Sequence, residues 1–443
     1  MAYLLGVLVI AVGVAISIAL HEIGHLVPAK RFGVKCTQYM VGFGPTLWSS
    51  RKGETEYGVK AIPLGGYVRM IGMFPPKPGR PVRADTTGRW SLMIEQARQD
   101  AQREVGPEDA GRLFYTRSVP KRLVIMLGGP TMNLLIAVVL LTIIVTGFGV
   151  AAETPKLAQV YACVLQPDAP VDAACTPQDP PAPAAAAGLR PGDTIVAFDG
   201  ARVTTWDEVR SAIRASGGRP VVLTVERSGQ RLDLPVTPVT TERPKLDADG
   251  NTVTGQDGNP VLERVGFLGV TPTRALVRQP VTAVPGIVGN LLGQTAGVIV
   301  RIPAKMVGVA QAAFGKGQRD PTGPVSIVGV GRFAGEVASA KGTLTPISWS
   351  DRLAQLLSLI VSLNLALFVF NLIPLLPLDG GHVAGALWEG LRRQVARLRH
   401  RPDPGPVDVA RALPLAYSVA TVLVGMSVLL IYADIVRPIR LGG

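Results

Sequence analysis

Two histidines and a glutamate stand near the end of the first apolar run of the chain. Within SIALHEIGHLVPAK, residues 17–30, His21 and His25 are four positions apart, and Glu22 follows His21 directly. Residues four apart share one face of an α-helix, so the two imidazoles can bind one metal ion while Glu22 lies beside them. The chain has only 4 histidines in 443 residues, which makes a chance match to this HExxH pattern rare. The spacing predicts a zinc site in which Glu22 carries a proton.

A third protein ligand is needed, because a catalytic zinc ion usually has three. Nothing suitable follows His25 at short range, and Glu54 and Glu56 fall in a predicted loop or strand. The better candidate is Asp379 in NLIPLLPLDGGH, residues 371–382. Its prolines and glycines interrupt a helix, and irregular backbone at membrane depth is tolerated where protein or water covers it. We therefore expect Asp379 to turn inward as the third ligand.

One further histidine, His382, follows Asp379 by three residues. The backbone between them is expected to be irregular, which makes a shared metal geometry hard to justify. We expect His382 to support a ligand from outside the metal site or to lie at the membrane interface.

The HExxH pattern ends an apolar run that is long enough to cross a membrane. Residues 3–20 carry no charge, and a helix of this length spans a hydrocarbon core about 30 Å thick. A signal peptide is the alternative, but no Lys or Arg precedes Lys30 and the apolar face continues through Leu26 and Val27. Ionisable groups inside a membrane are costly, so a functional site is favoured over two packing or capping histidines.

We expect four membrane helices in all, because four apolar stretches have the required length. Their limits are residues 1–29, 121–152, 351–382 and 411–436. The net charge is +13, and the positive residues cluster after the first stretch and before the last. Basic loops of this kind mark the cytoplasmic side, so residues 30–120 and 383–410 are expected there, in contact with the lipid bilayer. A basic cluster that binds anionic lipid or nucleic acid is the alternative, but no basic face with interleaved aromatic residues supports nucleic acid, and we expect no nucleic-acid partner.

A mostly polar segment separates the second and third predicted spans. Residues 153–183 are rich in Pro and Ala and are expected to form an extracytoplasmic linker. Residues 184–278 alternate short strands with turns and one helix, and around Gly188-Leu189 and Gly192-Asp193 they resemble a PDZ domain. The resemblance implies a groove that takes a peptide by strand addition. A spacer that binds nothing is the alternative, because a fold does not establish a function.

Two of the 3 cysteines, Cys163 and Cys175, lie in this polar segment. They can close a short loop as a disulfide if the segment faces an oxidising compartment, and two unpaired cysteines are the alternative. Cys36, beside the basic loop, is expected to stay reduced.

The HEIGH motif in a first span, together with N-x-x-P-x-x-x-L-D-G at residues 371–380, resembles the site-2 protease family of intramembrane zinc metalloproteases. The PDZ insertion between spans two and three is similar to the bacterial branch that releases anti-sigma factors. The resemblance implies that His21, His25 and Asp379 bind Zn²⁺ and that Glu22 is the catalytic acid and base. It also implies a polytopic α-helical protein of about four transmembrane helices, with a membrane-reentrant β-loop and an inserted α+β PDZ domain.

The resemblance extends to residues that would hold a substrate. Asn364 and Asn371 match positions that the family uses to hold the substrate strand or to orient the site. PLGGYVRMIG, residues 63–72, is similar to the reentrant β-loop, and Gly65 and Gly66 would let a substrate backbone pass close by. An interfacial cytoplasmic hairpin is the alternative. Many members of the family carry two PDZ domains, whereas only one can be recognised in this sequence.

The implied substrates are single-pass membrane proteins such as anti-sigma factors, in a bacterial inner membrane. Three other functional classes are weighed against this one. A conventional membrane-anchored metalloprotease would have its histidines in a soluble domain. A metal transporter would have polar groups on several spans. A metal-binding PDZ scaffold would have no use for Glu22 or Asp379. The oligomeric state is left open.

The number of membrane crossings between the ligands gives a check on the topology that does not depend on the family. For the histidine pair to meet Asp379, the first and third spans must both run from outside to inside. An odd number of crossings must then lie between them, and residues 121–152 supply one. Residues 279–350, including the apolar PGIVGNLLGQTAGVIVRIP, are therefore expected to form an extracytoplasmic amphipathic region. The same parity places the PDZ-like segment outside.

Overall fold

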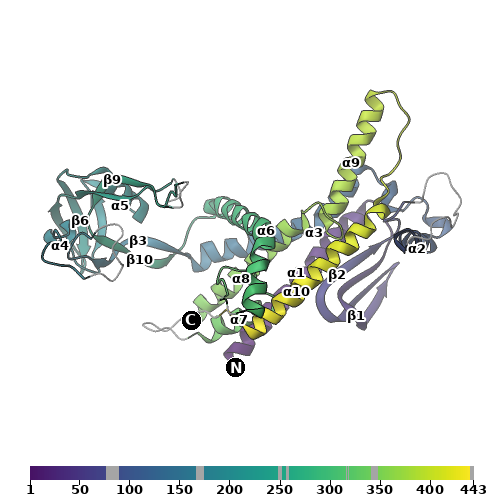
Figure 1. Ribbon diagram of the computed structural model, residues 1–443, viewed down its shortest axis with the longest axis horizontal. Coiled ribbons are helices and arrows are strands. Elements are labelled where there is room, and N and C mark those ends of the chain that lie inside the picture. The colour runs from purple at the N-terminus through teal and green to yellow at the C-terminus, as the bar shows by residue number, and fades with distance from the viewer. Residues whose placement is uncertain are drawn as a thin grey trace. The chain divides into compact units, whose positions relative to one another are not determined.

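The computed structural model describes residues 1–75, 89–165, 174–247, 252–255, 259–315, 317, 319–340 and 348–439. The chain divides into two compact units (Figure 1). The first consists of Met1–Phe148 and Pro280–Gly443, and the second, which we call the inserted unit, of Gly149–Gln279. Each unit has its own hydrophobic core.

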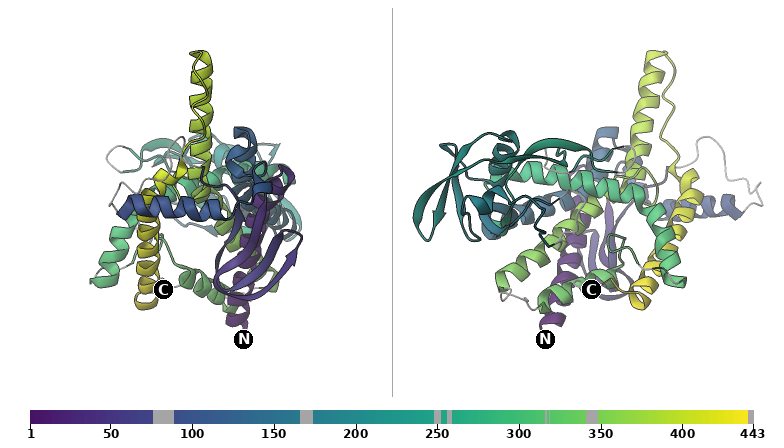
Figure 2. Two further views of the ribbon diagram at one scale, coloured as in Figure 1. Left: turned by 90° about the vertical axis from the view of Figure 1, so that its right-hand side faces the viewer. Right: turned by 60° about the vertical axis from the view of Figure 1, so that its left-hand side comes forward.

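The first unit is mainly helical. Its helices are α1 (Ala2–Arg31), α2 (Arg89–Arg103), α3 (Val119–Ile143), α6 (Val284–Phe314), α7 (Ile327–Ser339), α8 (Trp349–Asn371), α9 (Asp379–Leu398) and α10 (Leu413–Val436). A π-helical turn, Ile144–Phe148, continues α3. Residues 383–410, expected as a cytoplasmic loop, begin as the helix α9, which projects beyond the other helices of this unit (Figure 2).

Among the residues that the structure describes, five helices are long and apolar enough to cross a membrane, whereas the sequence predicted four. They are Ala2–Arg31, Val119–Phe148, Val281–Phe314, Trp349–Asn371 and Val409–Val436. The additional helix is Val281–Phe314, which has the lowest mean hydropathy of the five, 1.5. Its sequence is interrupted by Asn290, Gln294 and several glycines, but the helix continues through Pro303 to Phe314 and so gains the necessary length. Its place on the membrane surface stays a prediction.

Helix α1 is the centre of the first unit and contacts both α3 and α8. It runs antiparallel to α3, because His25 meets Ile125 and His21 meets Asn133. It runs parallel to α8, because Gly13 packs against Ile360 and Ser17 bonds to Asn364, four residues further along each helix. Parallel α1 and α8 have the relative direction that the parity argument requires.

A long β-hairpin packs along α1 in the first unit (Figure 1). Strand β1 (Cys36–Lys52) pairs antiparallel with β2 (Thr55–Met70) through several register shifts. The hydroxyl of Tyr39 on β1 donates to the carbonyl of Ala19 at 2.8 Å and ties the hairpin to α1. The reentrant β-loop expected near residues 55–74 therefore falls on β2, and its entry into the membrane stays a prediction.

The inserted unit has an α+β fold. Its strands are β3 (Val150–Val160), β4 (Thr194–Phe198), β5 (Ala201–Arg202), β6 (Val221–Arg227), β7 (Gln230–Val236), β8 (Val239–Pro244), β9 (Leu262–Phe267) and β10 (Val270–Val277), and its helices are α4 (Pro183–Ala186) and α5 (Trp206–Ala215). The main sheet has the order β10-β3-β4-β6-β7, with β5 on β4, and β8 pairs with β9. Helix α5 begins with a capping box in which the Thr205 side chain accepts from the backbone of Glu208.

The inserted unit begins earlier than the sequence indicated. Residues 153–183 were expected to be a linker, but β3 extends through Val160 and pairs with β10. Asp193 of the Gly192-Asp193 turn is buried and forms an ion pair with Arg227 at 2.7 Å. Cys163 and Cys175 form a disulfide, which resolves the alternatives that the sequence left open. Cys36 is free and buried.

Candidate active site

The three predicted metal ligands meet at one point. His21 and His25 lie one turn apart in the second half of α1. Residues 372–378 are not helical and separate α8 from α9, so Asp379 is the first residue of α9. The Nε2 atoms of His21 and His25 are 3.2 Å apart, and Oδ2 of Asp379 lies 3.3 Å from the first and 3.4 Å from the second.

This triangle fits a zinc ion. In a tetrahedral zinc site with bonds of about 2.0–2.2 Å, the ligand atoms lie about 3.3–3.6 Å from one another. The three distances fall at the lower end of this range or just below it. Within the described part of the chain, Oδ2 of Asp379 is buried and forms no hydrogen bond, although a buried carboxylate oxygen normally has a partner. Two imidazole nitrogens and a carboxylate oxygen are also the donors that catalytic zinc prefers.

Helix α3 contacts the other nitrogen of both imidazoles. Nδ1 of His25 lies 2.8 Å from the carbonyl oxygen of Ile125, and Nδ1 of His21 lies 3.0 Å from the amide of Asn133. Such outer contacts orient histidine ligands and fix their tautomers. We did not predict Asn133 from the sequence. The available signal was a single amide within LVIMLGGPTMNLLIAVV, because polar groups inside a membrane span usually have a function.

Glu22 is buried but does not belong to the triangle. Its carboxylate lies near the backbone N–H of Val68 on strand β2. A Cβ atom added at Gly66 would lie 2.9 Å from Cγ of Glu22, so a larger residue would displace Glu22. Gly65 has a φ of +98°, and a Cβ there would lie 2.7 Å from the ring of Phe43. Gly66 thus lets β2 approach Glu22 closely, and Gly65 allows the left-handed backbone that packs beside Phe43.

Three other predicted residues occupy different surroundings. Asn364 is fully buried and donates to Oγ of Ser17 and to the carbonyl of Ile360, both at 2.9 Å, so it links α8 to α1. Asn371 is the last residue of α8 and is half-buried. His382 lines a small cavity that Arg122 and Glu389 also line, and it is not one of the three grouped ligands. A substrate contact at Asn364 or Asn371 remains a prediction.

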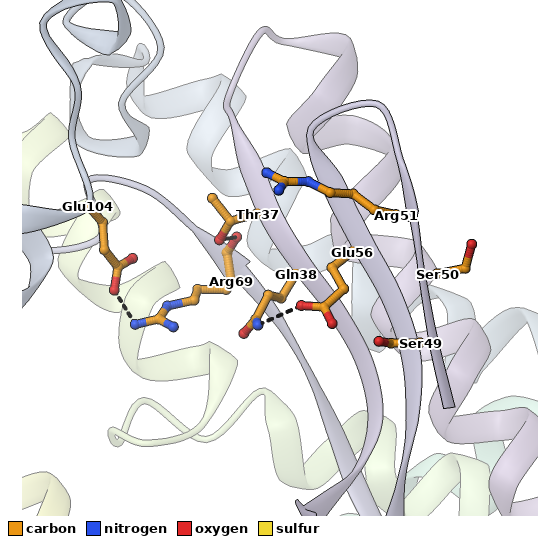
Figure 3. Close-up of a pocket in the computed structure, with 8 residues that line it drawn as sticks. All are labelled: Thr37, Gln38, Ser49, Ser50, Arg51, Glu56, Arg69 and Glu104. Atoms are coloured by element: carbon orange, nitrogen blue, oxygen red, sulfur yellow. Dashed lines mark hydrogen bonds and ion pairs between the residues drawn. The ribbon is translucent and has the colours of Figure 1, made fainter. Parts of the chain in front are cut away.

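The two glutamates weighed as alternative ligands are engaged elsewhere. Glu54 accepts two hydrogen bonds from Arg112, at 2.5 and 2.7 Å, and these lower the pKa of its carboxyl. Glu56 lies in an open polar cavity of ≈ 540 Å³ on the β-hairpin, where Gln38 donates to it at 3.0 Å (Figure 3). Although this cavity is large, its other lining groups are hydroxyls, Arg51 and an Arg69–Glu104 ion pair, and none of the three grouped ligands lines it.

Comparison with known proteins agrees with this geometry. The model of Peptidase family M50 matches residues 9–402. Zinc metalloprotease Rip1 of Mycobacterium tuberculosis is 36% identical over 445 residues, covering 100% of both chains. Zinc metalloprotease RasP of Geobacillus kaustophilus is 28% identical over 84% of this chain and 86% of its own, and metalloprotease MmpA of Caulobacter vibrioides is 25% identical over 86% of both. This chain therefore belongs to Peptidase family M50, the site-2 protease family, and is a metalloprotease.

Proposed function

We propose that this metalloprotease cleaves peptide bonds inside the membrane, in single-pass membrane proteins. The observation that carries the proposal is the position of its polar triangle. His21 and His25 lie within α1, one of the five helices that are long and apolar enough to span a bilayer. Asp379 lies directly after the break that ends α8, another of the five. A metalloprotease that acted on soluble substrates would have no reason to place its ligands on such helices.

The ligand set that we propose is His21, His25 and Asp379, and the metal is zinc. Zinc, when bound, supplies a Lewis acid that polarises a peptide carbonyl and acidifies water. Glu22 lies on the same helix but outside the triangle. Its carboxylate takes a proton from the attacking water and gives it to the departing amine nitrogen. In this role Glu22 is a proton carrier and not a ligand.

The substrate must be extended at the point of cleavage. Peptide bonds within a helix are shielded by their own hydrogen bonds, so the segment has to unwind before it can be cut. Strand β2 approaches Glu22 through Gly66, and a substrate that adds a strand to this hairpin beside Gly65 and Gly66 would be held extended next to the proton carrier. The preferred substrates are therefore transmembrane segments of weak helix propensity. Asn371, at the end of α8, is proposed to contact the same extended segment.

We also propose a sidedness and a class of partner. The basic clusters at residues 30–60 and 392–401 are cytoplasmic, and the inserted unit is a PDZ domain on the outside. The parallel direction of α1 and α8 supports this. The partners are single-pass proteins of a bacterial inner membrane, of which anti-sigma factors are one kind. The inserted unit would exclude substrates that still carry a bulky external domain.

The test is cleavage by the purified full-length chain in lipid vesicles. The substrate is a single-pass protein with a helix-breaking residue in its apolar segment, and products are mapped by mass spectrometry. We expect one cut within the apolar segment and none by Glu22→Gln. Cleavage of an unfolded soluble protein at a comparable rate, or a cut in the polar flanks, would contradict intramembrane proteolysis.

A further inference from the structure

Both histidines of the triangle have their second ring nitrogen against the same helix, α3. His25 meets a backbone carbonyl, that of Ile125, which can only accept a hydrogen bond. Nδ1 of His25 must therefore carry the proton, and its Nε2 lone pair faces the triangle. His21 meets a side-chain amide, that of Asn133, which can either donate or accept. Which ring nitrogen of His21 carries the proton thus depends on the orientation of the Asn133 amide.

The metal selects one of the two orientations of the Asn133 amide, because an Nε2 that binds zinc requires the proton on Nδ1 of His21, and only Oδ1 of Asn133 can accept it. With Nδ2 toward His21 Nδ1, at 3.0 Å, the amide donates, and Oδ1 of Asn133 is buried without a hydrogen-bond partner in the described part of the chain. Leaving a buried acceptor unpaired costs about 1–3 kcal/mol. In the flipped amide, which has nearly the same shape, Oδ1 accepts from Nδ1–H of His21. The flip pairs Oδ1 and leaves the Nε2 lone pair free for the metal, and Nδ2 then occupies the position that Oδ1 held.

We infer that Asn133 is a positioning residue for the metal: its Oδ1 accepts the Nδ1–H of His21 and thereby holds the tautomer whose Nε2 faces Asp379 and His25. This inference rests on the proposed zinc site. It assigns to α3 the selection of both histidine tautomers, one through a backbone carbonyl and one through an amide oxygen.

A role in helix packing alone does not account for Asn133. The chain contains a second buried asparagine between membrane helices, Asn364, which donates to Ser17 and to a backbone carbonyl and so links two helices. Asn133, by contrast, is 1% exposed and bonds to the imidazole of His21. The contact is held in register by the close crossing of α1 and α3, where a Cβ added at Gly128 would lie 1.9 Å from the carbonyl oxygen of Gly24.

The experiment measures zinc affinity of purified full-length protein by competition with a chromophoric chelator. Asn133→Leu removes the acceptor, and we expect zinc to bind about 10–100-fold more weakly. Asn133→Asp keeps an acceptor at the same position, and we expect affinity within about threefold of wild type, as carboxylate–histidine–zinc contacts are common. Asn364→Leu is the matched control, because it removes a buried asparagine without touching a ligand, and its zinc affinity should be unchanged.

A spectroscopic readout accompanies the affinities. In protein loaded with Co²⁺, Asn133→Leu should shift the visible ligand-field bands, and Asn364→Leu should not. Thermal unfolding of the metal-free proteins identifies variants that fail to fold, and the Asn133→Asp comparison then decides. Wild-type affinity in Asn133→Leu, or equal weakening in the Leu and Asp variants, would overturn the inference. Failure of the zinc site itself is distinguishable, because wild type and Asp379→Ala would then bind zinc equally.

Discussion

Gly129 of α3 lies against His25 of α1, so close that a Cβ atom added at Gly129 would be 2.2 Å from the Nε2 of His25. This nitrogen is the one that we assign to the metal. A methyl group at this position would collide with the ligand nitrogen and occupy space beside the triangle. Helix α3 therefore shapes the site both by its hydrogen bonds and by the lack of a side chain at residue 129.

The first prediction follows from this contact. Gly129→Ala should lower the zinc content of the purified protein below about one tenth of wild type, because His25 must move and the cost of a clash in a packed interior is about 1–3 kcal/mol or more. Gly147→Ala is the control, since no atom of the described residues lies within 4 Å of a Cβ there. Metal analysis of both proteins checks the prediction. Full zinc occupancy in Gly129→Ala would mean that Nε2 of His25 is not a ligand.

The second prediction concerns the membrane topology. Reporters inserted near Gly217 and near Thr322 should both be external, and one near Pro402 should be internal. The parallel α1 and α8 require an odd number of crossings between them. If α6 crossed as well, α7 would have to return the chain, but 13 residues of helix extend only about 20 Å. An internal reporter near Thr322 would show that α6 is a true span and that the parity argument is wrong.

The sequence predicted the parts of the site that depend on local spacing. The four-residue interval places His21 and His25 on one helical face. The prolines before Asp379 predict the helix interruption that lets Asp379 turn inward. Asn133 could not be paired in this way, because its partner lies 112 residues away and is reached only through the crossing of α1 and α3. For the same reason β3 was taken for a linker, since its partner β10 follows more than a hundred residues later.

A third prediction uses the buried thiol of Cys36. Burial raises the pKa of Cys36 from 9.0 to about 11. Above pH 9 the unfolded chain therefore loses this proton before the folded one, so the free energy of unfolding falls as the pH rises from 9 to 11. By pH 10 the loss should be about 1.4 kcal/mol larger in wild type than in Cys36→Ala.

Denaturation in detergent at pH 8 and pH 10 measures this difference. Cys36→Ala also lowers stability at every pH through the lost volume, but only the pH-dependent part reports the thiol. Identical pH dependence in the two proteins would show that Cys36 is accessible to solvent in the folded chain.

The fourth prediction concerns the inserted unit. Ala151 and Leu276 are partners in the β3–β10 pair, so a two-residue Asn-Gly turn can replace residues 152–275 without separating the ends. We expect the shortened chain to bind zinc and cleave a short substrate as wild type does, and in addition to cleave a substrate that still carries its external domain. A correctly inserted, zinc-loaded chain that cannot cut the short substrate would show that the inserted unit helps to build the site.

The central claim is that His21, His25 and Asp379 hold the metal while Glu22 carries the proton. Zinc content and cleavage measured together on Glu22→Gln and Asp379→Ala test it most directly. We predict about one zinc ion per chain in Glu22→Gln, with cleavage below about one per cent of wild type. Asp379→Ala should lose most of its zinc and its activity together. Full zinc occupancy in Asp379→Ala, or loss of zinc in Glu22→Gln, would contradict the assignment.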